Sequence, residues 1–475
     1  MSDQSGSSNN HKRKLSQVEY SEELSRHHTT GYLKASQAST EEDLYNAARF
    51  STPNAVAAGI KASLEANSIK HPIDDLPSPG AIIDAFVASA QMSSTSVPEQ
   101  IEGFTISSTK NWSDFTKSKF PAKTFEDHDV DIVNECCGVC GSDVHTITGG
   151  WGELATTPLC VGHEIIGKVL RVGSKVTLVK PGDRVGVGAQ VQSCMQCPQC
   201  KSDNENYCPN MVDTYMAPYK EDEGHSDKPM KDSNGNQIFS QGGYSSHSRV
   251  HEQFVFKVPD GLESTDAAPM MCAGLTTYSP LVRAGTGPGK KVAILGIGGL
   301  GHFGLLWAKA LGAEVWALSH SPNKKETAMK LGADHFVSTQ DKDWAKPLAF
   351  TFNFILNCAD MTNEFDLGAY MSTLAVNGEF HNVGLPDKPL PQLMAQDFVS
   401  NGCKIGASHI GSRKEAQAML QLAADKKIKP MIETIDISEE GCKKAVEKVK
   451  INDVRYRVTL TGFEKAFGTK VDYQK

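Results

Sequence analysis

A glycine-rich turn, Gly296-Ile297-Gly298-Gly299-Leu300-Gly301, constrains the fold of this 475-residue chain more than any other feature. A short apolar strand is expected before it, over residues 291–295, and a helix after it, over residues 302–311. In this context the first glycine makes a tight turn, the second lets the backbone approach a diphosphate, and the third packs helix against strand. The helix N-terminus then favours the negative charge. We therefore predict a dinucleotide site that uses Gly296, Gly298, Gly299, Leu300 and Gly301.

Strands and helices alternate after this turn. We expect strands over residues 314–318, 354–358 and 378–383, and a helix over residues 323–331 that ends at Gly332. Such alternation is typical of a parallel sheet with helices on both faces, the doubly wound or Rossmann type.

The end of the second strand indicates which dinucleotide binds. NAD sites usually place an acidic residue there, for the ribose 2′-hydroxyl. This chain has hydroxyls and cations instead, which suit a 2′-phosphate. The predicted NADP(H) contacts are Ser319, His320, Ser321 and Lys324. The alternative is that Lys324 and Lys325 form the solvated start of a helix.

Four cysteines, Cys194, Cys197, Cys200 and Cys208, lie within fifteen residues. Zinc takes four such thiolates in a closed tetrahedral site, so a structural zinc is predicted. The polar first ten residues argue against a secretory signal, and so against disulfides. A redox cysteine pair, an iron–sulfur cluster and unrelated reduced cysteines are the alternatives. Zinc modules that bind nucleic acids also carry such loops.

Three further residues are candidate metal ligands: Cys140, His163 and Cys272. Two thiolates and one imidazole would leave a fourth position on zinc open. Taken singly, a buried cysteine more often fills apolar space, and a lone histidine is more often a hydrogen-bonded core residue. The spacing alone does not bring the three together.

Residues 1–97 differ in composition from the rest of the chain. They are rich in Ser, Ala and Asn and contain no cysteine. We expect a largely disordered extension with short helices, one of them over residues 44–50. The basic run His11-Lys12-Arg13-Lys14 is either a solvated tail or a nuclear address.

Charge and hydropathy exclude some classes of protein. The chain has 48 Lys and Arg against 56 Asp and Glu, a formal charge of -8. This balance argues against a nucleic-acid binder. No apolar stretch reaches the ~18 residues of a membrane span. We expect a cytoplasmic protein, since Glu19, Glu22 and Glu23 also disfavour a mitochondrial transit peptide.

The order of these motifs resembles the zinc-dependent medium-chain alcohol dehydrogenases. The shared motifs are Gly138 to Asp143, Gly162 to Glu164, the four-cysteine loop, Met270 to Leu281, and the glycine-rich turn. Further markers resemble the NADP-dependent, cinnamyl alcohol dehydrogenase-like branch, especially its fungal members: Gly149 to Gly152, Ser240 to Tyr244, and Asp453 to Arg457. The resemblance covers about residues 98–467.

The resemblance implies an α/β plus β fold. A GroES-like β-barrel catalytic domain would comprise residues 98–278 and 434–475, with a Rossmann NADP-binding domain inserted over residues 279–433. It also implies a homodimer.

The resemblance further implies the roles of individual residues. Cys140, His163 and Cys272 would hold the catalytic zinc. Ser142 and His145 would relay a proton, Asp143 would orient His163, and Glu164 would coordinate the metal transiently. Trp151 would wall the substrate pocket, with Gln192 near it. The implied reaction transfers hydride between NADPH and aromatic or medium-chain aldehydes of the cinnamaldehyde type, forming primary alcohols.

Four features depart from the family pattern. Residues 1–97 have no counterpart, and the segment 218–236 is longer and more charged than usual. His320 stands where fungal relatives commonly carry arginine, and Gln192 where tryptophan is common.

Two alternative functions remain. A polyol or sugar-alcohol dehydrogenase would favour NAD and often lacks the four-cysteine loop. A non-enzymatic zinc-stapled binding protein would have a broken catalytic set.

Overall fold

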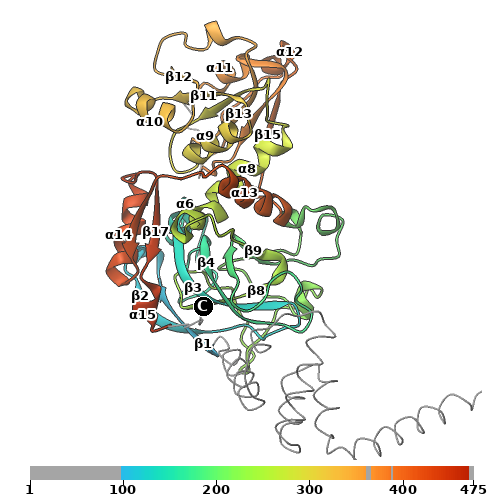
Figure 1. Ribbon diagram of the computed structural model, residues 1–475, viewed down its shortest axis with the longest axis vertical. Helices are drawn as coiled ribbons and strands as arrows, with labels where there is room; N and C mark the ends of the chain where they lie inside the picture. Colours follow the sequence, from blue (N-terminus) through green and yellow to red (C-terminus); the bar gives the residue numbers. More distant parts are fainter. Residues whose placement is uncertain (1–97, 360–364, 387–388, 470–475) are drawn as a thin grey trace, which may run out of the picture. The chain divides into compact units, whose positions relative to one another are not determined.

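The computed structural model describes residues 98–359, 365–386 and 389–469 (Figure 1). The predictions for residues 1–97, including the helix over 44–50 and the basic run, lie outside these ranges. Within them, no helix combines the length and the apolar character that crossing a membrane requires.

The first large sheet joins strands from both ends of the described chain. Its order is β16 (Ile432–Asp436), β17 (Arg457–Thr461), β3 (Asp129–Val139), β4 (Ile165–Val172), β5 (Arg184–Val187) and β9 (Val255–Lys257), with β8 (His247–His251) also on β3. All pairs are antiparallel except β16 with β17. Strand β4 ends at Val172, and the chain turns at Gly173. A Cβ there would lie 2.2 Å from the Asp127 carbonyl oxygen.

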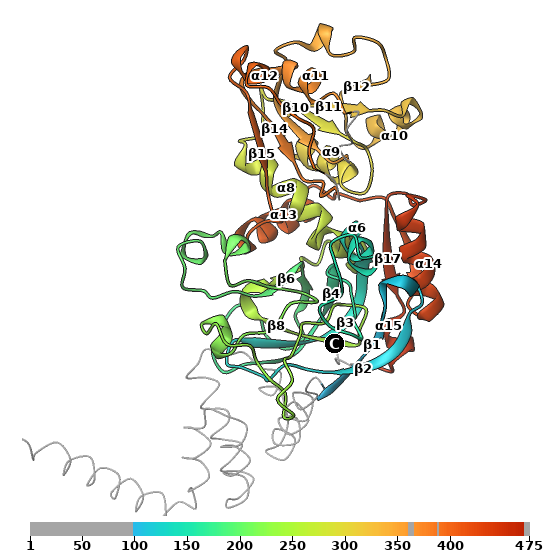
Figure 2. The same cartoon turned by 180° about the vertical axis from the view of Figure 1, so that it is seen from behind.

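Two small sheets and several helices complete this part of the chain. Strand β1 (Gln100–Thr105) pairs with β2 (Thr116–Pro121), and β6 (Gln190–Gln192) pairs with β7 (Val212–Asp213). The helices are α6 (Gly141–Ile147), α7 (Ser264–Ala267), α8 (Ala273–Arg283), α14 (Glu439–Lys450) and α15 (Phe463–Phe467). Strand β17 returns from the far end of the chain to pair with β3, so the C-terminal segment is part of the first sheet (Figure 2).

The second large sheet is entirely parallel. Its order is β12 (His335–Ser338), β11 (Glu314–Ser319), β10 (Lys291–Leu295), β13 (Phe352–Asn357), β14 (Leu374–Asn382) and β15 (Lys404–Ala407). Its helices are α9 (Gly301–Ala310), α10 (Lys325–Lys330), α11 (Leu367–Ser372), α12 (Gln396–Val399) and α13 (Arg413–Asp425). The strand order reverses between β10 and β13, which is where ligands bind in such sheets. The glycine-rich turn follows β10 at this point.

A continuous apolar core connects the two large sheets. Ile166, Phe256 and Met271 from the first part pack in one cluster with Val292 and Trp307 from the second. The Trp307 indole N–H donates to the Gly274 carbonyl at 3.0 Å, which ties α9 to α8. This core holds the end of β10 and the start of α8 in fixed positions.

Candidate active site and structural metal centre

Four buried side chains meet where β3, β4 and α8 come together. Cys140 ends the turn after β3, His163 and Glu164 precede β4, and Cys272 precedes α8. Their donor atoms all lie within 4.8 Å of one another. The sulfurs of Cys140 and Cys272 are 3.9 Å apart. Two thiolates on a tetrahedral zinc, each about 2.3 Å from the metal, would lie about 3.8 Å apart, so the donor set fits this ion.

Asp143 organises these ligands from the first turn of α6. Its carboxylate is fully buried and lies 2.9 Å from His163 Nδ1. It also accepts the backbone N–H of Cys140 at 2.9 Å and of Gly162 at 3.2 Å. The Tyr244 hydroxyl donates to it at 3.4 Å. With Nδ1 committed to Asp143, Nε2 is the ring nitrogen left for a metal, which is the usual arrangement of a ligating histidine.

Burial and the hydrogen bonds among these groups shift their pKa values. The pKa of the Cys140 thiol is held well below its usual range, chiefly by the hydrogen bond from Cys272 and in spite of burial. The pKa of Cys272 is raised because it donates that bond. Burial opposes protonation of His163, but the Asp143 carboxylate outweighs it and raises the pKa of His163. Metal binding would displace these protons, since thiolates and neutral imidazole are the ligating forms.

Glu164 and Arg457 form a buried ion pair beside the ligands. Arg457 Nη2 donates to Glu164 Oε1, and the two side chains are 6% and 0% exposed. The other carboxylate oxygen, Oε2, is buried without a hydrogen-bond partner. Burial raises the pKa of Glu164 to about 7 against the opposing charge of Arg457. A Cβ at Gly138 would lie 2.0 Å from Oε2, so only glycine at position 138 leaves room for this carboxylate.

The residues expected to relay a proton lie on α6. Ser142 Oγ is 3.7 Å from the Cys140 sulfur, and His145 follows on the same helix. The His145 ring stacks on Trp151, with centroids 5.2 Å apart and planes 10° from parallel. Trp151 is 43% exposed. These positions run from the ligand group towards the surface.

Gln192 is buried next to the segment 218–236. It is 1% exposed, and its side-chain oxygen accepts the backbone N–H of Lys220 at 3.4 Å. A Cβ on Gly224 would lie 3.2 Å from Gln192 Cγ. The long segment 218–236 thus covers Gln192.

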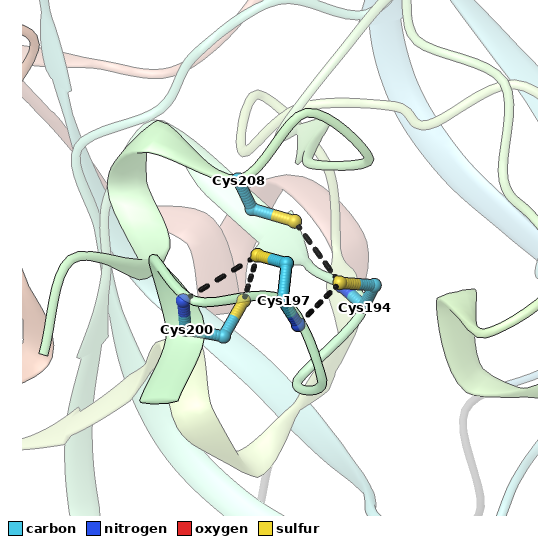
Figure 3. A group of neighbouring side chains, drawn as sticks. All are labelled: Cys194, Cys197, Cys200 and Cys208. Atoms are coloured by element: carbon cyan, nitrogen blue, oxygen red, sulfur yellow. Dashed lines mark hydrogen bonds between the residues drawn. The ribbon is translucent and has the colours of Figure 1, made fainter. Parts of the chain in front are cut away.

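The four-cysteine loop forms a second, compact group of sulfurs (Figure 3). The sulfurs of Cys197 and Cys200 are 3.5 Å apart, as are those of Cys194 and Cys208. Backbone N–H groups at Cys197 and Gln196 stabilise the Cys194 thiolate and outweigh burial, lowering its pKa to about 7. Four sulfurs at this spacing fit a closed zinc site.

This loop contacts the segment before α13. Asn206 Nδ2 donates to the His409 carbonyl at 2.7 Å, and the Tyr207 hydroxyl accepts the His409 N–H at 3.2 Å. Arg283 at the end of α8 also donates to Asn204 at 2.9 Å. The loop therefore holds the end of α8 and the segment before α13.

The glycine-rich turn has room for a ligand backbone. Gly296 has φ +84°, and a Cβ on Gly301 would lie 1.9 Å from the Gly296 carbonyl oxygen. A Cβ on Gly298, by contrast, would meet nothing within 4 Å. Gly296 and Gly301 are therefore required by the turn itself, while Gly298 borders open space where a diphosphate would approach.

The residues expected at the 2′-phosphate surround the end of β11. Ser319 Oγ accepts the Ser321 N–H at 3.1 Å, and His320 is exposed. Lys324 Nζ donates to the Ile297 carbonyl at 2.7 Å, which brings its charge to the glycine-rich turn. Burial lowers the pKa of Lys324. Leu300 and Gly299 continue the turn into α9.

Sequence reasoning gave no role to Arg457 or Tyr244, although both lie in motifs used as branch markers. Arg457 pairs with Glu164, and Tyr244 binds Asp143. The available signal was the type of residue: both side chains are buried, and a buried arginine or tyrosine needs a polar partner.

Comparison with known proteins gives matches over both large sheets. Residues 126–260 match the family described as alcohol dehydrogenase GroES-like domain, and residues 299–425 match the family described as zinc-binding dehydrogenase. NADP-dependent alcohol dehydrogenase 6 of Saccharomyces cerevisiae is 44% identical over 374 residues, 78% of this chain and 99% of that protein.

Two solved structures extend the likeness. A cinnamyl alcohol dehydrogenase of Sorghum bicolor superposes with TM-score 0.68 at 33% identity, covering 79% of this chain and 100% of the other. A cinnamyl alcohol dehydrogenase of Helicobacter pylori in complex with NADP(H) gives 0.66 at 32%, covering 76% and 98%. The predicted combination of a GroES-like fold with a Rossmann-type fold is confirmed over the described residues.

Proposed function

Because the chain belongs to the zinc-dependent medium-chain alcohol dehydrogenases of the cinnamyl alcohol dehydrogenase-like branch, we propose that it reduces aromatic or medium-chain aldehydes, of the cinnamaldehyde type, to primary alcohols. The class itself, an NADP-dependent zinc alcohol dehydrogenase, follows from the matches above. The substrate preference is our proposal. The observation that carries the site is the buried group of Cys140, His163 and Cys272, with Asp143 behind the imidazole.

The cofactors supply the central chemistry: bound zinc provides a Lewis acid for the substrate oxygen, and bound NADPH provides the hydride. Cys140, His163 and Cys272 would hold the metal. Asp143 fixes the ring of His163 and its tautomer through the bond to Nδ1. Arg457 compensates the charge of Glu164, which lies among the same donors.

The remaining residues handle a proton and exclude water. Ser142, beside the Cys140 sulfur, would donate its hydroxyl proton to the substrate oxygen once hydride has reached the carbonyl carbon, and His145 would pass a proton from solvent back to Ser142. Trp151, stacked on His145, would form a wall of the substrate pocket. Gln192 would influence which aldehydes fit the pocket, acting through the segment 218–236 that covers it.

The four cysteines of the loop would hold a structural zinc, giving two ions per chain. The contacts from Asn206 and Tyr207 to His409 support this assignment, because a stapled loop would fix the start of α13. The NADP(H) contacts would come from the glycine-rich turn together with Ser319, His320, Ser321 and Lys324.

We also propose the domain division 98–278 plus 434–475, with 279–433 between them. All strands from β10 to β15 fall in the inserted part, while β17 pairs with β3.

A homodimer is proposed through β15, whose outer edge has no strand partner among the described residues. Exposed Met394 (65%) and Val399 (80%), just before this strand, support an interface with a second copy. Analytical ultracentrifugation tests it, and Val399→Asp should shift the mass to that of a monomer.

The experiment that tests the function is oxidation of NADPH, with NADH in parallel, by zinc-loaded full-length protein given cinnamaldehyde. We expect turnover with NADPH and little with NADH. A Cys272→Ala variant should lose activity and about one zinc per chain. Retained activity in that variant would refute the site. Turnover confined to polyols, or none with cinnamaldehyde and aliphatic aldehydes, would refute the substrate class.

A cytoplasmic location is a separate proposal, which imaging of a fluorescent fusion in the source cells would test.

A further inference from the structure

The segment Arg455-Tyr456-Arg457, just before and at the start of β17, lies against the glycine-rich turn. The Tyr456 ring stacks on His302, with centroids 5.4 Å apart and planes 19° from parallel. His302 in turn bonds the Gly299 carbonyl through Nδ1 at 2.9 Å. A Cβ on Gly299 would lie 3.2 Å from Arg457 Nη1 and 3.4 Å from the Tyr456 carbonyl oxygen. A strand of the first sheet thus begins beside the dinucleotide turn of the second.

The two arginines of this segment differ in their partners. Arg457 is buried, and Glu164 neutralises its charge. Arg455 is exposed, and its guanidinium contacts Tyr456, with Nη1 3.5 Å from the phenol oxygen. The Glu433 carboxylate accepts the backbone N–H of Arg455 but pairs with Lys448. Within the ranges that the structure describes, no carboxylate forms an ion pair with the Arg455 side chain.

Lys324 brings a second uncompensated cation to the same turn. Its ammonium group donates to the Ile297 carbonyl at 2.7 Å and pairs with no described carboxylate. The charge of Arg455 reaches this group, since it adds to burial in lowering the pKa of Lys324. Two like charges that act on each other are unfavourable, and an anion that contacts both would offset their repulsion. Their positive field therefore favours an anionic ligand beside the turn.

We propose that Arg455 is a cofactor-binding residue: its guanidinium binds a phosphate group of the dinucleotide, together with Lys324. This inference rests on the proposed binding of NADP(H) at the glycine-rich turn. Arginine suits the task, because its planar fork can donate two hydrogen bonds to one phosphate. Position 320 carries a histidine where the family resemblance places an arginine. Arg455 would supply the missing guanidinium from the C-terminal segment.

Two phosphate groups of the cofactor are within the same chemistry, the 2′-phosphate and the diphosphate. Ile297, which binds Lys324, lies in the turn that a diphosphate would approach, while Lys324 itself follows the end of β11 where a 2′-phosphate would lie. NADPH carries both groups and NADH only the diphosphate. Comparing the two dinucleotides therefore distinguishes the two contacts.

The test measures dissociation constants of the zinc-loaded full-length protein by fluorescence titration, with NADPH and with NADH separately. The variants are Arg455→Gln, which removes the charge, and Arg455→Lys, which keeps it without the fork. Lys450→Gln is the matched control: Lys450 is exposed at the end of α14 and its loss changes the net charge equally. Zinc content and circular dichroism verify that each variant folds.

We expect Arg455→Gln to raise the dissociation constant of NADPH about tenfold, the size of one charged hydrogen bond. Arg455→Lys should recover part of this loss and Lys450→Gln should change little. A loss for NADPH alone supports a contact to the 2′-phosphate, and an equal loss for NADH supports one to the diphosphate. Unchanged affinity for both dinucleotides in Arg455→Gln overturns the inference, as does an equal loss in Lys450→Gln. Neither outcome affects the proposed function, which fails instead if the wild-type protein does not use NADPH.

Discussion

The Asp143 carboxylate lies 2.9 Å from Nδ1 of His163, and both side chains are buried behind the sulfurs of the candidate catalytic site. Asp143→Asn keeps the shape but removes the charge that holds the imidazole. We expect the affinity for the catalytic zinc to fall by about 10- to 100-fold, the usual effect of changing a group that orients a metal ligand. Competition with a chromophoric chelator measures it. An unchanged zinc affinity would show that Asp143 serves only the local backbone.

The glycine-rich turn allows folding and binding to be separated. Gly301→Ala should destabilise the protein, because its Cβ would clash with the Gly296 carbonyl oxygen at 1.9 Å. Gly298→Ala should leave the melting temperature unchanged, since its Cβ meets no protein atom within 4 Å, yet weaken NADPH and NADH alike by blocking the diphosphate. Thermal unfolding and dinucleotide titration of both variants test this pair. Normal binding by Gly298→Ala would mean that the diphosphate lies elsewhere.

Lys324→Ala tests the choice of dinucleotide. The Lys324 ammonium group follows the end of β11 closely in sequence and contacts the glycine-rich turn through the Ile297 carbonyl. Its removal should raise the KM for NADPH at least about tenfold, the size of one charged contact, and leave the KM for NADH nearly unchanged. Lys325→Ala, at the exposed neighbouring position, is the control. Equal losses for both dinucleotides would contradict a 2′-phosphate contact.

His302 predicts a loss of stability in acid. Burial lowers the pKa of its imidazole to about 3, so the folded protein leaves it neutral while the unfolded chain protonates it near its ordinary value of 6.5. Its stabilising contribution is thus complete above pH 6.5 and declines as the pH falls. By pH 5 the loss amounts to about 2 kcal/mol. His302→Asn, which keeps a donor for the Gly299 carbonyl, should show a smaller loss between pH 7 and pH 5 in urea unfolding. Parallel pH curves for the two proteins would refute this reading.

The four-cysteine loop should be separable from catalysis. Cys200→Ser is expected to lose about one zinc per chain and several degrees of melting temperature, because the loop then holds the start of α13 less firmly. The catalytic site, which shares none of its ligands, should keep its own zinc. Elemental analysis and calorimetry measure both effects. A variant that retained two zinc ions would exclude Cys200 as a ligand.

Local patterns predicted four strands of the parallel sheet, β10, β11, β13 and β14, but not β12 or β15. Strand β10 begins and ends where expected, and α9 begins one residue early, because a glycine-rich turn between a buried strand and a helix admits few geometries. The antiparallel sheet was less predictable. Strand β17 follows β3 by more than three hundred residues, and such a pairing leaves no periodic trace in either segment.

The candidate metal ligands also differ in how far local sequence predicts them. The four-cysteine loop was evident from its spacing, whereas Cys140, His163 and Cys272 required a resemblance to be placed together. Arg457 and Tyr244 belong to recognisable motifs, but their sequence context does not show that they are buried. Their pairing with Glu164 and Asp143 follows only from that burial. Gln192 lies beneath the segment 218–236, whose path over the protein surface depends on contacts that are distant in sequence.

The ion pair between Glu164 and Arg457 has a consequence for biosynthesis. The two residues are 293 positions apart, so at usual translation rates the ribosome adds Arg457 roughly 15–60 s after Glu164. During that interval β4, which follows Glu164, can pair with its early neighbours, but the Glu164 carboxylate lacks the charge of Arg457 and favours contact with water. The buried ion pair can therefore form only after β17 has been synthesised, whereas all strands of the parallel sheet precede β17 in the chain.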